Sequence, residues 1–301
     1  MCKQKILRMS DFRLKVFQSV AHHLSFTKAS QELFISQPAI TKHIHELEIN
    51  YGAQLFERKG NRIALTDAGR LLLRHCDHIL DEYKQLDYEM NLLHDDFVGE
   101  LRLGASTTIA QYVLPPVLAQ FIKRYPKVKL SLLNGNSRDV EKALQEHRID
   151  LGLVEGISRL PNLKYSTFLE DELVAVVSAD SKLAHKRKIF PEDLAHIPLV
   201  LREYGSGTLD VIELALAKNH IRFADLQILM YLGSTESIKL FLQHADCMGI
   251  VSVRSIQNEL NTGKLQIVEI EQMSMLRQFD FVQLQGIESG LSQLFIRFAQ
   301  Q

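Results

Sequence analysis

Near the start of the chain, apolar residues recur every three or four positions, which is the period of an amphipathic helix. This spacing predicts a first helix over about residues 10–23 and a second, shorter helix that ends near residue 33. Ser25 is a good N-cap for the second helix. The inward positions are Phe12, Val16, Phe17 and Val20 in the first helix and Ala29 and Leu33 in the second.

A third helix, predicted over about residues 37–48, has one apolar and one polar side. Ser36 is a candidate N-cap, and Pro38 falls in the first turn, where its missing N–H is not needed. At 3.6 residues per turn, the inner side carries Ile40, Ile44 and Leu47, and the outer side carries Pro38, Thr41, Lys42 and His45, with Gln37 at the tip. Such a short, polar and mildly cationic face suits a DNA major groove. An ordinary solvated face is the alternative.

The residues that follow favour the DNA interpretation. The stretch QLFERKGNRIALTDAG contains two short extended pieces around a turn at Gly60 and Asn61. Arg58, Lys59 and Arg62 cluster at that turn, which is typical of a basic wing beside a helix-turn-helix.

At this point the sequence resembles the winged helix-turn-helix of LysR-type bacterial transcriptional regulators. The resemblance rests on SFTKASQELFISQPAITKHIHELE and GAQLFERKGNRIALTDAGRLLL. It implies that the residues matching the family's helix entry and wing approach double-stranded DNA, and it leaves RNA polymerase open as a further partner. The predicted DNA contacts are Ser36, Gln37, Pro38, Ala39, Thr41, Lys42, His45, Arg58, Lys59 and Arg62.

A long helical pattern starts at Thr66 and runs to about residue 97. Leucine or isoleucine recurs every seven residues at Leu72, Ile79, Leu86 and Leu93. A lone helix cannot bury such a seam, so it should pair with a second chain, as the linker helix does in LysR-type dimers. The alternative is a helix that lies on its own C-terminal domain. Tetramers are usual in such families, and the sequence does not distinguish two chains from four.

The linker also carries His75, Cys76 and His78. These residues lack a fourth ligand, so we interpret them as part of a solvated helix face rather than a metal site.

Beyond residue 98, short strand patterns alternate with helical ones, which indicates an α/β domain. Strands are predicted near 101–106, 128–134 and 150–154, with helices near 109–125 and 137–147. A second set follows, and two α/β lobes joined by crossing strands would place a ligand cleft between them. The resemblance to the LysR effector domain, which is similar to periplasmic binding proteins, extends here. The expected divisions are 1–65, 66–97 and 98–301, with lobe I over about 98–168 and 271–301 and lobe II over about 169–270.

Four loops that connect a strand to a helix are candidates to line this cleft. They are rich in hydroxyl and amide donors, and helix N-termini favour anions, so we expect a small, anionic effector. Each loop taken alone is also explained as a plain N-cap. The candidate residues are Ser106, Thr107, Thr108, Asn136, Ser137, Arg202, Gly205, Ser206, Gly207, Thr208, Ser234 and Thr235.

Composition limits the remaining alternatives. The net charge is −1, but residues 1–65 hold ten Lys or Arg and five Asp or Glu, so this part is +5 and the remainder −6. Such an asymmetry is typical of a chain in which one part meets a polyanion. Three widely spaced cysteines indicate neither a disulfide framework nor a zinc site, and no apolar run could span a membrane, so a cytoplasmic location is expected.

Motifs for catalysis are also missing from the sequence. There is no nucleophile elbow, P-loop or dinucleotide-binding motif, and no motif for a resident cofactor. The sequence therefore predicts a ligand-responsive transcription regulator and not an enzyme. A solute-binding module without DNA activity is the other alternative.

Overall fold

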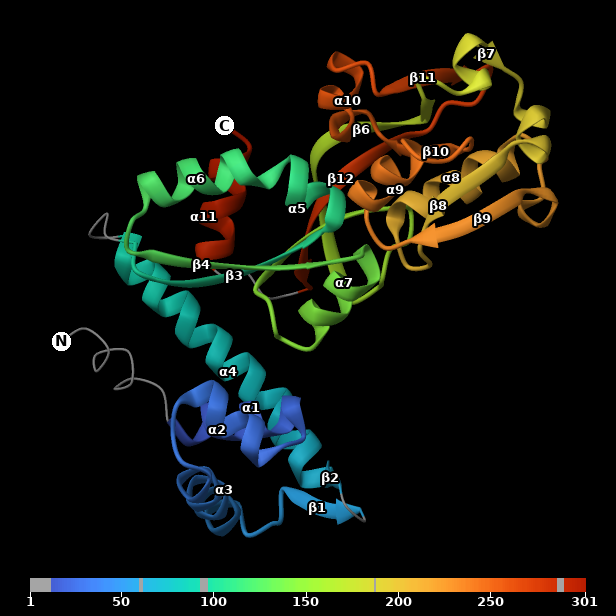
Figure 1. Cartoon of the computed structure of the whole chain (residues 1–301). Helices are drawn as coiled ribbons and strands as arrows, with labels where there is room; N and C mark the ends of the chain where they lie inside the picture. The colour runs from blue at the N-terminus through green and yellow to red at the C-terminus, as the bar shows by residue number, and fades with distance from the viewer. Residues whose placement is uncertain (1–11, 60–61, 93–96, 187, 286–289) are drawn as a thin grey trace. The chain divides into compact units, whose positions relative to one another are not determined.

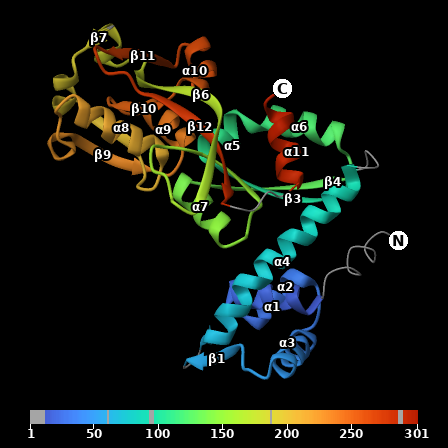
Figure 2. The same cartoon turned by 180° about the vertical axis from the view of Figure 1, so that it is seen from behind.

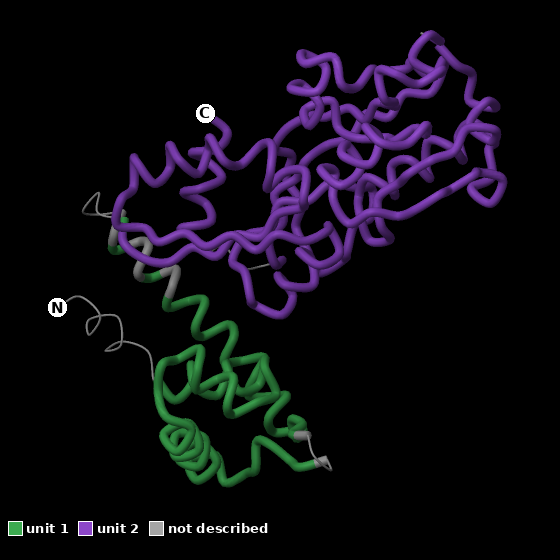
Figure 3. Tube along the Cα trace, viewed as in Figure 1, with its two compact units in different colours: residues 1–97, 287–290 green, residues 98–286, 291–301 purple. Residues whose placement is uncertain are grey.

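The computed structural model describes residues 12–59, 62–92, 97–186, 188–285 and 290–301 (Figure 1). It divides into two compact units, residues 1–97 with 287–290 and residues 98–286 with 291–301 (Figure 3). The predicted turn at Gly60 and Asn61 and the last seam residue, Leu93, lie outside the described residues. So do the first residues of the first predicted helix.

The first unit contains three short helices, a two-stranded wing and a long helix. Ser25 and Ser36 cap α2 and α3 as predicted, with their hydroxyl oxygens accepting from the N–H groups of Lys28 at 3.2 Å and Ala39 at 3.4 Å. Helix α3 continues three residues beyond its predicted end and stops at Gly52, whose φ of 63° favours glycine. The elements are α1 (Phe12–His23), α2 (Phe26–Leu33), α3 (Gln37–Tyr51), β1 (Phe56–Lys59), β2 (Arg62–Leu65) and α4 (Asp67–Leu92).

One apolar core holds these helices together. The predicted inner side of α3 is buried against α1 and α2, and Cys76 and Leu80 of α4 complete the same cluster. Our interpretation of Cys76 as part of a solvated face is therefore wrong. Its thiol is buried and donates to the carbonyl oxygen of Leu14 at 3.2 Å, whereas His75 and His78 are exposed. Among the described residues, no group of three or more His, Cys, Asp or Glu side chains could hold a metal ion.

The second unit is α/β, as predicted. Its strands are β3 (Gly99–Ser106), β4 (Val128–Gly135), β5 (Leu151–Glu155), β6 (Leu163–Ser178), β7 (Lys188–Ile189), β8 (Pro198–Arg202), β9 (Gln227–Leu232), β10 (Met248–Ser252), β11 (Leu265–Ile270) and β12 (Leu276–Leu284). Its helices are α5 (Thr107–Tyr112), α6 (Leu114–Arg124), α7 (Ser137–Gln145), α8 (Gly207–Lys218), α9 (Thr235–Leu242), α10 (Gln257–Asn261) and α11 (Gly290–Ala299), with 3-10 turns at Lys182–His185, Pro191–His196, Phe223–Asp225 and Val253–Ser255.

Two parallel three-stranded groups are joined by a pair of long antiparallel strands. The order is β4-β3-β5-β12-β6-β10-β8-β9. Strand β6 pairs with β12 over Leu163–Glu172 and then with β10 over Leu173–Val177, so it passes from one group to the other. We call the part built on β3, β4 and β5 lobe I and the part built on β8, β9 and β10 lobe II. The two crossing strands are the connection predicted between the lobes.

Helices cover both faces of the sheet in each lobe (Figures 1 and 2). In lobe II, α8 packs on one face and α9 on the other, through separate apolar clusters. In lobe I, α7 covers one face, while α6 and α11 lie together, with the Phe121 ring tilted against Phe295 and edge-to-face with Phe298. No described helix is both long and apolar enough to cross a membrane.

One predicted helix in lobe I is wrong. The pattern over residues 109–125 forms two helices, because α5 ends at Tyr112 and α6 starts at Leu114. Pro115 and Pro116 lie in the first turn of α6, where they need no backbone donor, and they could not continue α5.

Candidate DNA-binding and effector sites

The predicted DNA-facing side of α3 is open to solvent. Gln37, Pro38, Thr41 and His45 are exposed, and 77% of the Lys42 side chain is accessible. Because the opposite side is buried in the core, the helix can present this polar stripe outward without loss of packing.

Contacts within the stripe are few and weak. The Thr41 hydroxyl donates to the Gln37 carbonyl oxygen at 3.1 Å, and the Gln37 side-chain oxygen accepts from Thr27 at 3.4 Å. Lys42 lies 4.0 Å from Glu46, an exposed pair of little energetic value, so its ammonium can turn to a phosphate. Of the other predicted contacts in this region, Ser36 is exposed and Ala39 half-buried.

The wing is a hairpin in which β1 and β2 run antiparallel. Arg58 pairs with Ile63 across the two strands, and Lys59 pairs with Arg62 next to the turn. The Arg58 side chain is exposed. The side chains of Lys59 and Arg62 lie outside the described residues.

In lobe I, the first two predicted effector loops touch each other. The Thr107 hydroxyl donates to the carbonyl oxygen of Gly135 at 3.1 Å, which joins the end of β3 to the end of β4. The hydroxyl of Ser137 donates to the carbonyl oxygen of Glu155 at 2.7 Å. These loops and the end of β5 therefore meet at one edge of the sheet, as expected for parallel strands.

The third loop, from lobe II, lies directly on this edge. The backbone N–H of Arg138 donates to the carbonyl oxygen of Gly205 at 3.2 Å, and Arg202 donates through Nη2 to the Thr107 hydroxyl at 3.4 Å. A Cβ at Gly207 would overlap the carbonyl oxygen of Glu155, so no larger residue fits there.

The fourth loop reaches lobe I through Tyr112. The Tyr112 hydroxyl donates to the carboxylate of Glu236, in the first turn of α9. All four predicted loops are thus brought together where the two lobes meet.

Several of the predicted effector residues act as helix caps. The side chains of Asn136, Ser206 and Ser234 accept from backbone N–H groups of α7, α8 and α9. Ser106 instead donates to the carboxylate of Glu155. The alternative of plain N-caps therefore describes these three contacts.

Two of the predicted effector residues carry a buried donor that has no partner among the described residues, and Nη2 of Arg277 is a third such donor at the junction. The residues Arg202 and Thr108 are each 1% exposed. Arg202 binds Glu203 through Nε and Nη2, at 2.8 and 3.0 Å, yet its Nη1 and the Thr108 hydroxyl find no hydrogen-bond partner among the described residues. A buried donor without an acceptor is costly, so an acceptor supplied by a ligand would stabilise this arrangement.

A buried ionic cluster at the same junction was not foreseen from the sequence. Arg277 of β12 donates through Nε to Asp171 at 2.7 Å and through Nη1 to the Thr208 hydroxyl at 2.8 Å, and its Nη1 lies 3.7 Å from Glu155. The Asp171 carboxylate also accepts from Ser252 at 2.7 Å. The cluster ties the crossing strands to both lobes.

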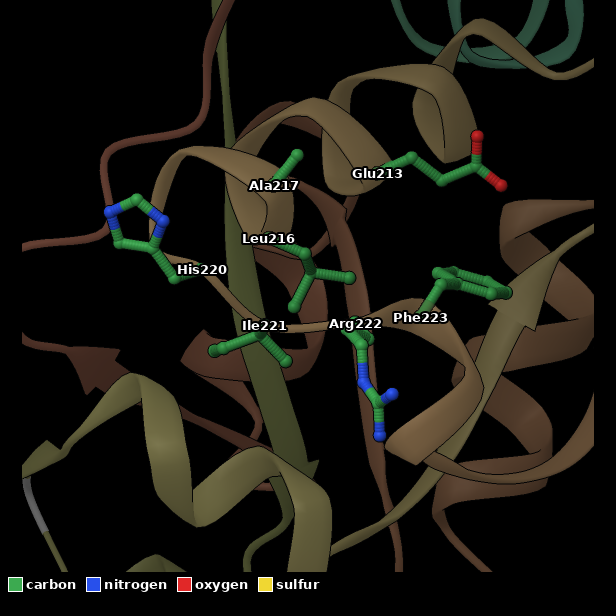
Figure 4. Close-up of a pocket in the computed structure, with 7 residues that line it drawn as sticks. All are labelled: Glu213, Leu216, Ala217, His220, Ile221, Arg222 and Phe223. Carbon is green, nitrogen blue, oxygen red and sulfur yellow. The ribbon is translucent and has the colours of Figure 1, made fainter.

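A pocket of about 590 Å³ lies elsewhere in lobe II, at the C-terminal end of α8 (Figure 4). Its lining is mostly apolar, with Glu213 and Arg222 as charged groups, and none of the predicted effector residues lines it. The lining residues are Glu213, Leu216, Ala217, His220, Ile221, Arg222 and Phe223.

Comparisons with known proteins agree with this architecture. Residues 12–70 match the bacterial regulatory helix-turn-helix family of LysR type, and residues 94–301 match the LysR substrate binding domain. The HTH-type transcriptional regulator YeiE of Escherichia coli (strain K12), itself uncharacterized, is 34% identical over 265 residues, which is 88% of each chain.

Solved structures show the same fold. The regulatory domain of Synechocystis PCC6803 CcmR, determined in complex with 2-PG, is 28% identical with a TM-score of 0.61 and covers 67% of this chain and 96% of its own. Full-length OxyR from Pseudomonas aeruginosa, solved as a cysteine-to-aspartate variant, has a TM-score of 0.74 at 16% identity and covers 97% of this chain and 94% of its own. With both family matches and a relative aligned over most of its length, the chain belongs to the LysR family of DNA-binding transcriptional regulators, which are not enzymes.

Proposed function

We propose that this regulator binds its operator as a homo-oligomer paired along α4 and responds to a small anion held at the junction of its two lobes. Base contacts come from Gln37 and Thr41, and phosphate contacts from Lys42 and the wing arginines. Because its target is DNA, the protein acts in the cytoplasm.

The proposal of an anionic effector rests on Nη1 of Arg202, which has no partner among the described residues. A guanidinium has five N–H donors and no acceptor, so its partner must be an acceptor such as an electron-rich oxygen. Glu203 occupies one edge of the group at 2.8 and 3.0 Å. Arg202 also contacts Thr107, the chain neighbour of Thr108, whose hydroxyl likewise has no partner in the described part of the chain. A carboxylate or phosphate bound here would accept from both kinds of donor.

The similarity to CcmR supports the same class of effector. That domain was determined in complex with 2-PG and is 28% identical to this chain over the effector region. Lobes rich in hydroxyl and guanidinium donors favour a small polar ligand over a large apolar one.

Pairing along α4 rests on an exposed apolar stripe. Ile79, Leu86 and Met90 are 41%, 39% and 50% exposed, and at 3.6 residues per turn they lie within about 40° of one another. Leu72, the first residue of the predicted seam, is half-buried against the core of the first unit. A second copy of α4 would cover the exposed stripe of Ile79, Leu86 and Met90.

The effector proposal is tested by calorimetric titration of the full chain. The panel is inorganic phosphate, sulfate, glycolate and 2-PG, with glycerol as the neutral analogue. Thr108→Val is nearly isosteric and removes a hydroxyl that bonds to nothing among the described residues. We expect it to leave the melting temperature unchanged or raised but to weaken anion binding at least about tenfold, or ~1.4 kcal/mol.

Thr262→Val is the matched control, because its exposed hydroxyl bonds only within lobe II, to the carbonyl oxygens of Asn258 and Glu259. Thr262→Val should change neither the affinity for the anion nor DNA binding. If glycerol binds more tightly than every anion of the panel, or if Thr108→Val binds the anion with wild-type affinity, the anion site is not where we place it.

A further inference from the structure

A polar contact joins the two lobes at the fourth of the effector loops. Tyr112, the last residue of α5 in lobe I, donates its hydroxyl to the carboxylate of Glu236 in α9 of lobe II. Helices α5 and α9 lie side by side in both views (Figures 1 and 2). The contact therefore links helices that are separated by more than a hundred residues in sequence.

The lobe II side of this contact is fixed by a buried lysine. The Lys239 side chain is only 5% exposed, and its Nζ lies 2.7 Å from Glu236, 3.1 Å from Glu259 and 2.8 Å from the carbonyl oxygen of Ser255. Three partners from α9, α10 and the preceding turn hold the ammonium, so Glu236 is presented to lobe I in one orientation. Charge-assisted bonds of this kind are stronger than neutral ones.

Tyr112 completes the cluster from the other lobe in two ways. Its hydroxyl bonds to Glu236, and its ring stands 5.2 Å from Nζ of Lys239, within the range of a cation–π contact. In both interactions Tyr112 of lobe I contacts a side chain of lobe II, first Glu236 and then Lys239. Separating the lobes would break both at once and leave Lys239 next to solvent or an empty space.

The position of Tyr112 connects the cluster to the effector loops. Helix α5 has only six residues, with Thr107 and Thr108 in its first turn and Tyr112 at its end. A helix this short moves as one piece, so whatever fixes Tyr112 also fixes the two threonines.

We infer that Tyr112, Glu236 and Lys239 form a latch between the lobes, in which Tyr112 is a positioning residue for the effector site. The latch holds α5 against lobe II and so keeps Thr107 and Thr108 in the binding arrangement. Its role in effector binding rests on the proposed function, whereas its role in holding the lobes does not.

The latch itself is tested without any ligand, by amide hydrogen exchange on the full chain. Tyr112→Phe keeps the ring over Lys239 and removes only the hydroxyl. We expect exchange in α5 and α9 to rise at least about fivefold, because a hydrogen bond to a charged acceptor is lost.

Tyr165→Phe is the matched control. The Tyr165 hydroxyl also donates to a glutamate, Glu141, at 2.7 Å, but both residues belong to lobe I. This variant should leave exchange in α5 and α9 unchanged. Equal exchange in these helices for the two variants would overturn the latch.

The effect on binding is measured by titrating both variants with the same anion panel. Tyr112→Phe should raise the apparent dissociation constant about three- to tenfold, because a smaller fraction of the protein is in the binding arrangement, and Tyr165→Phe should not. If wild-type protein binds an anion of the panel and Tyr112→Phe binds it with the same affinity, Tyr112 does not position the effector site. If wild-type protein binds no anion of the panel, the proposed effector fails, and the exchange result alone decides the latch.

Discussion

Replacing Arg277 by methionine should destabilise the effector domain strongly. The Arg277 side chain is 2% exposed and makes ionic contacts at 2.7 Å to Asp171 and 3.7 Å to Glu155, as well as a 2.8 Å hydrogen bond to Thr208. Methionine has a similar length and fills much of the same space. The change therefore removes the cation and its donors while disturbing the packing little.

The magnitude follows from what is left behind. The carboxylates of Asp171 and Glu155 are 0% and 1% exposed, and each keeps a serine hydroxyl as a donor, from Ser252 and Ser106 respectively. Asp171 also keeps the half-exposed Arg254 at 3.6 Å, so the main loss falls on Glu155 and on the short contact to Asp171. Removing one partner of a buried ion pair costs about 3–5 kcal/mol. For a domain of this size, that corresponds to a fall in melting temperature of about 6 to 20 °C.

The assay is thermal unfolding of the full chain followed by circular dichroism, with hydrogen exchange to assign the transition to the effector domain. Arg222→Met is the control, since Arg222 makes a two-bond contact to Asp225 at 2.7 and 2.9 Å but is 81% exposed, and it should change the melting temperature little. Adding Asp171→Asn to Arg277→Met should recover part of the loss. If Arg277→Met melts like the control, the cluster does not stabilise the junction.

Two further predictions concern DNA binding and assembly. Gln37→Ala should relax sequence preference at a cost of about 1–3 kcal/mol, while Lys42→Ala should weaken binding to all DNA alike and lower the slope of the salt dependence by about 1. Both are measured by fluorescence anisotropy on DNA selected from a random pool, and wild-type behaviour in both variants would exclude this side of α3 from the interface. The double variant Ile79→Asp, Leu86→Asp should dissociate the oligomer in analytical ultracentrifugation, because a pair of helices would bury four unpaired charges. Leu71 is also exposed but lies about 80° around α4 from the middle of the stripe, so Leu71→Asp should leave the oligomer intact. An unchanged oligomer in the double variant would mean that α4 pairs elsewhere.

Features that depend on near neighbours in the chain could be predicted from the sequence. Ser25 and Ser36 were identified as N-caps because a cap bonds to a backbone N–H only two or three residues ahead. The same holds for the inner side of α3, since the helical period alone places Ile40, Ile44 and Leu47 together. The division of α5 from α6 was also readable in Pro115 and Pro116, although the apolar period across them predicted one helix.

The burial of Cys76 shows where local reasoning fails. Its neighbours His75 and His78 are exposed, so the sequence around it resembles a polar face. Only the packing of α4 against α1, with Leu14 as the acceptor of the thiol, decides that this position is inside. The helical period fixes which residues share a side, but not which side meets another element.

By itself, the sequence determined the winged helix-turn-helix, the long amphipathic α4 and an α/β effector domain with four polar loops at strand ends. The tertiary structure alone decided which side chains meet at the junction. Arg277 lies 106 residues from Asp171, and Tyr112 lies 124 residues from Glu236. Capping and helical period act over a few residues, whereas contacts across crossing strands depend on register and lobe packing, so no local pattern could have named these partners.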